Sequence, residues 1–338
     1  MIFSENYPLK KLNSFHTNVY ARYFAVINNT DELKDFFSDK SRLSHSILIL
    51  GGGNNILFTK DFEGYVLKIN IKGKEIIYED ADFVHLKISA GEDWDDFVAY
   101  CVENNWAGLE NLSLIPGQIG SSPIQNIGAY GVEVKDTIIE VNAFNINTQK
   151  IETFNNSECQ FGYRNSIFKN KLKHTHIIIS VTFKLNKKTV LNTCYDAIRK
   201  ELDSKKIITP TIKDIRQIVC NIRQNKLPDP NVIGNAGSFF KNPVVPEQIF
   251  KSIKRKFFDV VAYKSDNNHY KLAAGWLIEK CGWKGYREGD AGVHEKQALV
   301  LVNYGHANGS EILNLAGKIK QNIFDTFNVE LEFEVKIL

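Results

Sequence analysis

The stretch IPGQIGSSPIQNIGAYG, residues 115–131, predicts a long loop in which small residues are interleaved with polar ones. Glycine lets a backbone approach a ligand closely, and serine hydroxyls and side-chain amides supply hydrogen-bond donors and acceptors. A long loop without structure of its own is usually functional when it lies inside a compact domain. Four isoleucines occur in the stretch, which an ordinary surface loop explains less well. The stretch therefore favours a binding loop for a polar cofactor, with a surface loop as the alternative.

A second glycine-rich segment, Gly51-Gly52-Gly53-Asn54-Asn55, follows the apolar run SILIL at 46–50. Successive backbone N–H groups of such a turn can form an anion-binding nest, as a diphosphate requires. The segment is not a dinucleotide-binding fingerprint, because Ile56 stands where the third glycine should be. It also lacks the Gly-Lys-Ser/Thr of a Walker A loop. A plain tight turn is the alternative.

The sequence around these two segments predicts an α+β fold, because strand patterns are interspersed with helical ones. Strands are expected at 46–50, 64–70, 74–79, 83–89, 137–145, 149–154, 176–185, 298–303 and 329–338. Helices are expected at 93–105 with Asp93 as a possible N-cap, 211–225, 246–257, 272–281, and 309–327 with Ser310 near its cap. The pattern changes after about residue 205, so a domain boundary is expected near 205–220.

Length and composition predict a globular protein of two or three domains. The chain has 338 residues, more than one hydrophobic core usually serves. Hydrophobic residues make up 43% and charged residues 24%, which is not the balance of a disordered chain. The net charge is +3, from 42 basic and 39 acidic residues. This small excess, without a long basic run, argues against a nucleic-acid-binding protein.

Cysteine usage and the N-terminus predict a cytoplasmic protein. The five cysteines are far apart and form no CxxC pair, which argues against a zinc ribbon or a dithiol redox centre. We expect reduced, buried thiols and no metal site. The first residues, MIFSENYPLKK, lack the apolar core of a signal peptide, and no apolar run reaches the length of a membrane span.

Three shorter segments contain residues suited to catalysis. In FGYRNSIFK, residues 161–169, Arg164 stands among aromatic residues; such an arginine suits a partly desolvated anion, with a structural ion pair as the alternative. In GNAGSFFKNP, residues 234–243, small residues leave room for a partner to approach Ser238. In the terminal run LEFEV, alternation puts Glu332 and Glu334 on one strand face, with a solvated face as the alternative.

Four longer segments closely resemble the UDP-N-acetylenolpyruvoylglucosamine reductase (MurB) family of peptidoglycan synthesis. They are GLENLSLIPGQIGSSPIQNIGAYGVE, ECQFGYRNSIFK, KLPDPNVIGNAGSFFKNP and KLAAGWLIE. The resemblance runs in the same order from about Leu12 to the C-terminus. The form looks like the type I reductase, which has an extra segment around a substrate-covering tyrosine. Tyr195, in VLNTCYDAI, is the best match for that tyrosine.

The resemblance implies a flavin domain of the vanillyl-alcohol-oxidase (PCMH) type in two lobes, followed by an α+β substrate-binding domain. We expect the first lobe at 1–70, with the strand 328–338 returning to the flavin and substrate site. The second lobe is expected at 71–210 and the substrate domain at 211–327. The implied enzyme is a monomer that binds FAD without a covalent link and takes a hydride from NADPH. It reduces UDP-N-acetyl-enolpyruvylglucosamine to UDP-N-acetylmuramate and involves neither nucleic acid nor membrane insertion.

The resemblance also implies roles for individual residues. Arg164 and Glu334 stabilise the enolate formed from the substrate, and Ser238 donates the proton. Residues that contact the sugar nucleotide are Tyr163, Tyr195, Lys226, Asn242 and Gln297. Residues that bind the flavin are Gly51, Gly52, Gly53, Asn54, Asn55, Pro116, Gly117, Gly120, Ser121, Ser122, Gln125, Asn126, Gly128 and Gly131.

The chain departs from the family pattern at two of these segments. Asn54 stands where the family usually has a serine after the first strand, so an amide replaces a hydroxyl beside the diphosphate. Phe333 stands where the family commonly has a proline before the catalytic glutamate, which should preserve the position of Glu334.

Two alternative functions remain open from the sequence. One is another FAD-dependent oxidoreductase of the same fold, such as an oxidase or dehydrogenase of alcohols. Many of those tether the flavin through a histidine near the turn that corresponds to residues 51–55, the first glycine turn of the chain. Residues 50–60 contain no histidine. The other is a non-catalytic protein that binds a nucleotide sugar, which the retained trio Arg164, Ser238 and Glu334 disfavours.

Overall fold

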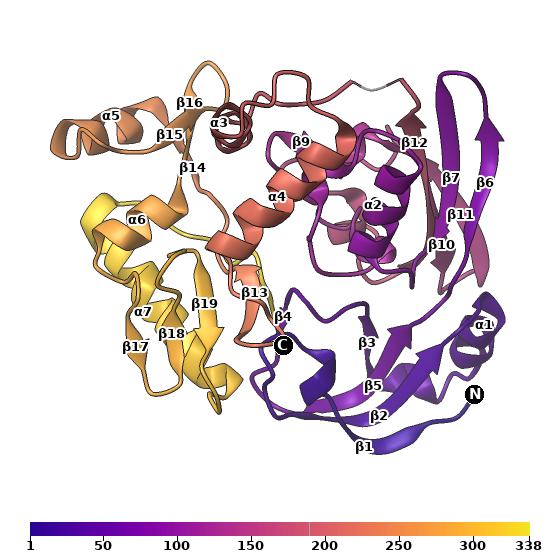
Figure 1. Ribbon diagram of the computed structural model, residues 1–338. Coiled ribbons are helices and arrows are strands. Elements are labelled where there is room, and N and C mark those ends of the chain that lie inside the picture. Colours follow the sequence, from indigo (N-terminus) through magenta and orange to yellow (C-terminus); the bar gives the residue numbers. More distant parts are fainter. Residues whose placement is uncertain (189) are drawn as a thin grey trace. The chain divides into compact units, whose positions relative to one another are not determined.

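The computed structural model describes residues 1–188 and 190–338, and the chain divides into two compact units. The first unit comprises residues 1–7, 22–52 and 63–225. The second comprises residues 8–21, 53–62 and 226–338. Both units contain sheets and helices (Figure 1), so the expected α+β class is confirmed.

The first unit contains a four-stranded sheet with the strand order β1-β2-β5-β3. Its strands are β1 (Ser4–Pro8), β2 (Tyr20–Ile27), β3 (Ser46–Leu50) and β5 (Phe62–Ile69). Helix α1 (Thr30–Ser38) packs Phe36 and Phe37 into one core with Ile27 and Leu67 of the sheet. Strands β3 and β5 are parallel and confirm two predicted strands, and the first glycine turn begins directly where β3 ends.

The same unit contains a five-stranded antiparallel sheet with the order β11-β10-β12-β7-β6. Its strands are β6 (Lys74–Glu79), β7 (Phe83–Ser89), β10 (Ile138–Asn145), β11 (Lys150–Asn155) and β12 (His176–Asn186), each within a few residues of its prediction. Helix α2 (Trp94–Glu103) lies beside this sheet (Figure 1), and its Phe97 packs against Phe183. Asp93 is its N-cap, as predicted, because its carboxylate accepts hydrogen bonds from the N–H groups of Asp95 and Asp96.

Helices α3 (Asp196–Ser204) and α4 (Ile212–Lys226) complete the first unit. Ile198 and Leu202 of α3 share a small core with Ile215 and Val219 of α4. The helix predicted at 211–225 is confirmed, and α3 was not predicted.

The second unit is built on the antiparallel sheet β13-β19-β18-β17. These strands are β13 (Gly234–Ser238), β17 (Arg287–Glu288), β18 (Ala291–Val293) and β19 (Val300–Asn303). Helices α6 (Ala274–Lys280) and α7 (Gly309–Phe327) pack with this sheet into one hydrophobic core. The N-cap of α7 is Asn308 in a capping box with Glu311, so the predicted cap at Ser310 lies two residues too far along.

A smaller part of the second unit consists of a three-stranded sheet and α5 (Glu247–Lys256), which has three basic residues in its last turn. The strands are β14 (Val244–Pro246), β15 (Ala262–Lys264) and β16 (His269–Leu272). Short strand pairs also form between β4 (Ile56–Leu57) and β20 (Lys336–Ile337), and in the first unit between β8 (Gly128–Ala129) and β9 (Val132–Glu133).

The predicted terminal strand over 329–338 is wrong for most of its length. Only β20 is a regular strand, and Phe333 forms an isolated antiparallel bridge with Phe240. The chain bends at Glu334 and Val335, then pairs with β4 in parallel. The segment changes partner at this bend, so alternation in the sequence does not become one continuous strand.

The cysteines are all free thiols, but only Cys101 and Cys159 are buried as predicted. Cys194 is exposed, and Cys220 and Cys281 are half-buried. Among the residues that the structure describes, no helix has both the length and the apolar character needed to cross a membrane.

Candidate functional site

Arg164 lies in a tight two-residue turn of the first unit. Gly162 and Asn165 exchange both backbone hydrogen bonds, at 3.0 and 3.1 Å, so Tyr163 and Arg164 occupy the corner. Arg164 has φ of 51°, which L side chains rarely adopt and which costs about 1–2 kcal/mol outside glycine and asparagine. Backbone strain of this kind is often kept at functional sites.

The guanidinium of Arg164 is held by the 115–131 loop. Its Nη2 donates to the carbonyl of Gly128 at 2.9 Å, and Nη1 lies 3.5 Å from the carbonyl of Asn126. A Cβ on Gly128 would lie 3.0 Å from both the carbonyl oxygen of Val132 and Cγ of Glu133, so glycine allows the chain to pack closely here. The guanidinium also lies 5.7 Å from the ring centroid of Tyr163. The predicted catalytic arginine and the predicted flavin loop therefore meet within one unit.

Two buried polar residues of the 115–131 loop have side chains that are engaged in hydrogen bonds. Asn126 is 0% exposed; its amide donates to Glu133 and to the carbonyl of Gly162, and its Oδ1 accepts from Lys135 N–H. Ser122 is 1% exposed and donates to the carbonyl of Ile119. These two side chains stabilise the shape of the loop.

Other members of the loop lie closer to its surface. Pro116, Gly117, Gly120, Ser121, Gln125, Gly128 and Gly131 are exposed or half-buried. Gly117 and Gly131 have φ of 136° and 80°, a conformation that glycine adopts without strain. Ser121 donates to the carbonyl of Gln118 at 2.6 Å, which leaves its oxygen able to accept a second bond.

The first glycine turn is divided between the units. Gly51 and Gly52 end the β3 segment of the first unit, and Gly53 begins a segment of the second. Gly53 has φ of 73°, and a Cβ there would lie 2.0 Å from the carbonyl oxygen of Leu12, so only glycine fits. Asn54 and Asn55 follow half-buried, and the side-chain amide of Asn55 donates to the carbonyl of Glu334 at 3.2 Å.

Ser238 follows a β-bulge in the second unit. In the pairing of β13 with β19, Asn235 lies opposite Val302 and Ser238 opposite Val300, so β13 contains one extra residue. The side chain of Asn235 holds the bulge by accepting from Gly237 N–H at 3.0 Å. A bulge redirects the side chains around it, and here Ser238 is exposed while Phe239 and Phe240 after it are buried. Ser238 is the last residue of β13.

Glu334 is joined to the residue that follows Ser238. Its N–H donates to the carbonyl of Phe239 at 2.9 Å, and Lys241 N–H donates to the carbonyl of Glu332. The ring of Phe333 packs against Phe239 at 5.5 Å and Phe240 at 5.6 Å, centroid to centroid. The packing of the Phe333 ring thus holds this segment in place. A proline at the same position would instead restrict the backbone.

Asn242 and Gln297 meet at the start of α6. Asn242 Oδ1 accepts from the N–H of Ala274 at 2.9 Å, and a Cβ on Gly275 would lie 3.2 Å from Gln297 Oε1. Lys226 is the exposed last residue of α4, at the boundary of the units.

The predicted catalytic and substrate-binding residues are divided between the two units. The first unit contains Arg164, Tyr163 and Tyr195, and the second contains Ser238, Glu334, Asn242 and Gln297.

Tyr195 stands directly before α3, is 44% exposed and packs its ring edge-on against that of Tyr130 at 5.3 Å. Arg223, a neighbour of Tyr130, was not predicted. Burial raises the pKa of Tyr130, and the nearby guanidinium of Arg223 opposes that rise. Arg223 follows Ile215 and Val219 at four-residue spacing, so its place on the apolar face of α4 was readable from the sequence.

Lys68 is a second residue that the prediction missed. It lies in β5, and its ammonium donates to the carbonyl of Gly51 and to Gln118 Oε1, the latter at 3.3 Å. It links the first glycine turn to the 115–131 loop. A lysine inside the apolar run VLKI was the available signal.

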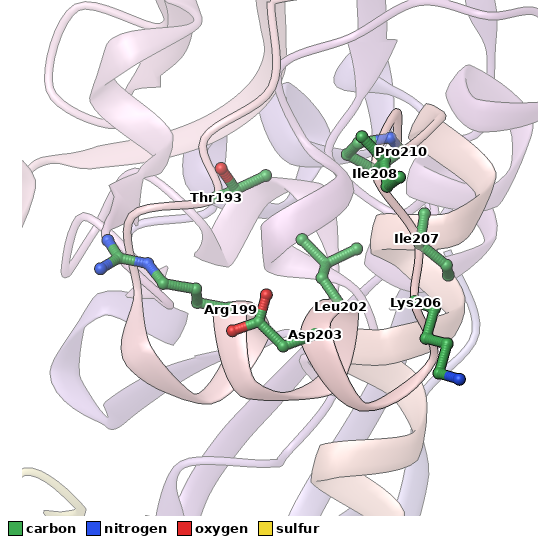
Figure 2. Close-up of a pocket in the computed structure, with 8 residues that line it drawn as sticks. All are labelled: Thr193, Arg199, Leu202, Asp203, Lys206, Ile207, Ile208 and Pro210. Atoms are coloured by element: carbon green, nitrogen blue, oxygen red, sulfur yellow. The ribbon is translucent and has the colours of Figure 1, made fainter.

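One pocket of the first unit, of about 440 Å³, is lined by none of the predicted site residues (Figure 2). It lies beside the C-terminal half of α3, with Arg199 and Lys206 at its two ends. Ile208 on its rim is 94% exposed, so the pocket is shallow and open. In the described part of the chain, no three His, Cys, Asp or Glu side chains are grouped to hold a metal ion.

Comparisons with known proteins give matches along the whole chain. The sequence model of an FAD binding domain matches residues 21–154. The model of the UDP-N-acetylenolpyruvoylglucosamine reductase C-terminal domain matches residues 229–338. The UDP-N-acetylenolpyruvoylglucosamine reductase of Flavobacterium johnsoniae is 49% identical, over 100% of both chains. That of Amoebophilus asiaticus is 46% identical, also over 100% of both.

A solved structure has the same fold. The crystal structure of UDP-N-acetylenolpyruvylglucosamine reductase (MurB) from Thermus caldophilus aligns with a TM-score of 0.69. The alignment covers 99% of this chain and 98% of that one, at 20% identity. With the FAD binding domain match, this confirms the expected architecture of a PCMH-type flavin domain and a substrate domain.

Proposed function

The chain belongs to the UDP-N-acetylenolpyruvoylglucosamine reductase family, and we propose that Arg164, Ser238 and Glu334 carry out the chemistry of its reaction. That reaction reduces UDP-N-acetyl-enolpyruvylglucosamine to UDP-N-acetylmuramate for peptidoglycan synthesis, with NADPH as the hydride donor. When bound, FAD would take a hydride from NADPH and make it available to the β-carbon of the enolpyruvyl group.

The glycine segments fit FAD by the chemistry of their donors. Gly51 and Gly52 follow β3 with backbone N–H groups for a diphosphate, and the Lys68 ammonium lies against Gly51. Asn54 and Asn55 add side-chain amides, and Gly53 gives the turn its backbone conformation. In the 115–131 loop we assign the contacts to Pro116, Gly117, Gly120, Ser121, Gln125, Gly128 and Gly131. Ser122 and Asn126 belong to the same proposed set, and their buried side chains also hold the shape of the loop.

Arg164 stabilises the negative charge that develops on the substrate after hydride addition. The charge spreads over the α-carbon and its carboxylate, and a planar guanidinium can contact that carboxylate through two parallel hydrogen bonds. The bond to the Gly128 carbonyl holds the guanidinium in one orientation before substrate enters. Such preorganisation is what makes electrostatic stabilisation effective in a transition state.

Ser238 gives its proton to the α-carbon and then recovers one from water. A serine hydroxyl is a weak acid, but a carbanion-like carbon is a strong base. The single observation that best supports this role is the bulge, because it leaves Ser238 exposed at the end of a strand whose next residues are buried. Glu334, in its protonated form, donates a hydrogen bond to the developing enolate, since an ionised carboxylate would repel it.

Polar and aromatic groups are further proposed to bind the sugar nucleotide. We assign this contact to Tyr163, Tyr195, Lys226, Asn242 and Gln297. The exposed rings of Tyr163 and Tyr195 and the exposed ammonium of Lys226 support the assignment. The functional domains are assigned to residues 1–70 with 328–338, 71–210, and 211–327. The protein is further proposed to be a cytoplasmic monomer that holds FAD without a covalent bond.

Stopped-flow spectroscopy tests the function directly. Purified protein should be yellow, NADPH should bleach it, and the enolpyruvyl sugar nucleotide should then restore the colour in the absence of oxygen. A bleached protein that only oxygen or an alcohol-derived carbonyl compound reoxidises would indicate another FAD-dependent oxidoreductase. A protein that binds the sugar nucleotide without any flavin change would indicate a binding protein. Acid precipitation should release all flavin into the supernatant, because residues 50–60 contain no histidine to tether it.

A further inference from the structure

Lys68 connects three segments of the first unit at the first glycine turn. Its ammonium donates to the carbonyl of Gly51 and to Oε1 of Gln118, and the Nε2 of Gln118 donates to the carbonyl of Gly91 at 3.0 Å. Lys72 also donates to the carbonyl of Gly91. Two lysines therefore lie around one glutamine of the 115–131 loop.

The bond from Lys68 fixes the orientation of the Gly51–Gly52 peptide. A trans peptide is planar, and its carbonyl and N–H point in opposite directions. When the Lys68 ammonium holds the Gly51 carbonyl, the N–H of Gly52 points to the opposite side of the peptide. A cation at the carbonyl end also makes the N–H a stronger donor, because it polarises the peptide dipole. The arrangement favours an anion on the Gly52 side.

The surroundings of Lys68 leave its charge largely uncompensated. Its acceptors are a backbone carbonyl and a side-chain amide, and no salt bridge to it occurs among residues 1–188 and 190–338. Burial lowers the pKa of Lys68 to about 8, and the charge of Lys72 adds to the effect. A carboxylate does lie near the second lysine, because Oε2 of Glu92 is 4.0 Å from Nζ of Lys72. A half-buried cation without a counter-ion is costly unless a ligand brings the opposite charge.

We propose that Lys68 is a positioning residue for the FAD diphosphate, which acts through the Gly51–Gly52 peptide and supplies the positive charge beside it. The inference rests on the placement of the diphosphate at this turn under the proposed function. It goes beyond the glycine residues, because it names the side chain that orients them and predicts a proton linked to cofactor binding.

The proton linkage follows from the charge of the cofactor. The diphosphate keeps two negative charges across the pH range 6–9, and its arrival stabilises the protonated form of Lys68. Below about pH 8 the lysine is already protonated in the empty site, so binding takes up no proton. Above about pH 8 binding must protonate it, and the dissociation constant of FAD rises by up to about tenfold per pH unit. Lys72 and Glu92 are the other titratable groups that face this network.

Three variants separate this role from a purely structural one. Lys68→Met keeps a long apolar stem and removes the charge and the donor. Lys68→Arg keeps a cation that does not titrate in this range and can donate to both acceptors. Lys72→Met is the matched control, since it makes the same change at the other lysine of the network.

The experiment measures FAD dissociation constants for apoprotein prepared by acid removal of flavin, from pH 6.5 to 9. Wild type should bind FAD more weakly above about pH 8. Lys72→Met should show the same weakening at a higher pH, because the charge of Lys72 contributes to the lowered pKa of Lys68. Lys68→Arg should bind close to wild type at pH 7, with the pH dependence lost. Lys68→Met should bind about tenfold or more weakly at pH 7, also without that pH dependence. Circular dichroism and a melting curve check that each apoprotein is folded.

Two results would overturn the proposal: FAD affinity unchanged in Lys68→Met, or the wild-type pH dependence retained in Lys68→Arg. If Lys68→Met does not fold, Lys68→Arg alone decides. Riboflavin, which has no phosphate, is the second ligand: its affinity should be the same in wild type and Lys68→Met. An equal loss for riboflavin and FAD would place Lys68 at the flavin ring and refute the diphosphate role. Failure of the wild type to bind FAD would instead refute the proposed function.

Discussion

The backbone N–H of Glu334 donates a hydrogen bond to the carbonyl of Phe239 at 2.9 Å, which ties the proposed hydrogen-bond donor to the residue after the proposed acid. The connection is between backbones and does not depend on either reactive side chain. Substitution of Ser238 or Glu334 should therefore leave it intact. Loss of activity in such variants can be read as loss of chemistry, provided that the bulge before Ser238 is kept.

The bulge itself predicts a cost for a methyl group at Gly237. Gly237 has φ of 67°, and a Cβ there would have no heavy atom within 4 Å. Gly237→Ala should therefore lower the free energy of unfolding by about 1–2 kcal/mol through backbone strain alone. It should also slow reoxidation of the reduced enzyme, since Ser238 would be displaced. Urea denaturation gives the stability.

Gly317→Ala is the matched control for Gly237. Gly317 lies in α7, also without a heavy atom within 4 Å of a Cβ, but in helical conformation. Alanine should raise the free energy of unfolding there by about 0.5–1 kcal/mol. A Gly237→Ala variant whose free energy of unfolding is unchanged or raised, as expected for Gly317→Ala, would contradict the strain at Gly237.

Arg164 should show the same strain at a functional position. Its φ of 51° favours glycine, whereas alanine is ordinarily the more stabilising residue. Arg164→Gly and Arg164→Ala both lack the guanidinium and its bond to Gly128, so their comparison isolates the backbone. Arg164→Gly should be more stable by about 1 kcal/mol, and both should be inactive. If alanine proves the more stable, the turn does not hold Arg164 under strain.

The sequence predicted local features well and several long-range ones poorly. Asp93 as an N-cap and the strand before Gly51 depend on neighbours in the chain, so patterns of a few residues determine them. The bulge at Ser238 depends on pairing with Val300, far along the chain, and no local pattern specifies it. The terminal segment was predicted as one strand because its alternation hides a change of partner at Glu334. Lys68 was missed because its acceptor at Gln118 is 50 residues away.

Arg164→Lys should not preserve activity. An ammonium is a point charge and cannot make two parallel hydrogen bonds to a carboxylate. Turnover with the enolpyruvyl substrate should fall, while FAD content stays normal, since the flavin loop keeps Ser122 and Asn126 in place. Steady-state kinetics and the flavin absorbance of the purified variant measure the two effects. Wild-type turnover would remove Arg164 from the mechanism.

Glu334→Gln should be less harmful than Glu334→Ala. If the working form is a protonated carboxyl that donates a hydrogen bond, an amide partly replaces it and a methyl group does not. Both variants keep the backbone bond to Phe239, so their stabilities should agree within about 0.5 kcal/mol. Rates of reoxidation by the enolpyruvyl substrate give the comparison. Equal losses in the two variants would indicate that an ionised carboxylate is required.

Ser238→Ala should separate the two halves of the reaction. NADPH reduces the flavin before the sugar nucleotide is involved, so bleaching should proceed at close to the wild-type rate. Reoxidation by the enolpyruvyl substrate should slow by about 10²–10⁴-fold, the usual effect of losing a positioned acid. Ser238→Cys should recover part of this rate, because a thiol is a stronger acid of similar shape. Stopped-flow measurement of each half, with a melting curve, distinguishes the outcomes. Slowing of both halves together would mean that the substitution disturbed the flavin site, and unchanged reoxidation would exclude Ser238 as the proton donor.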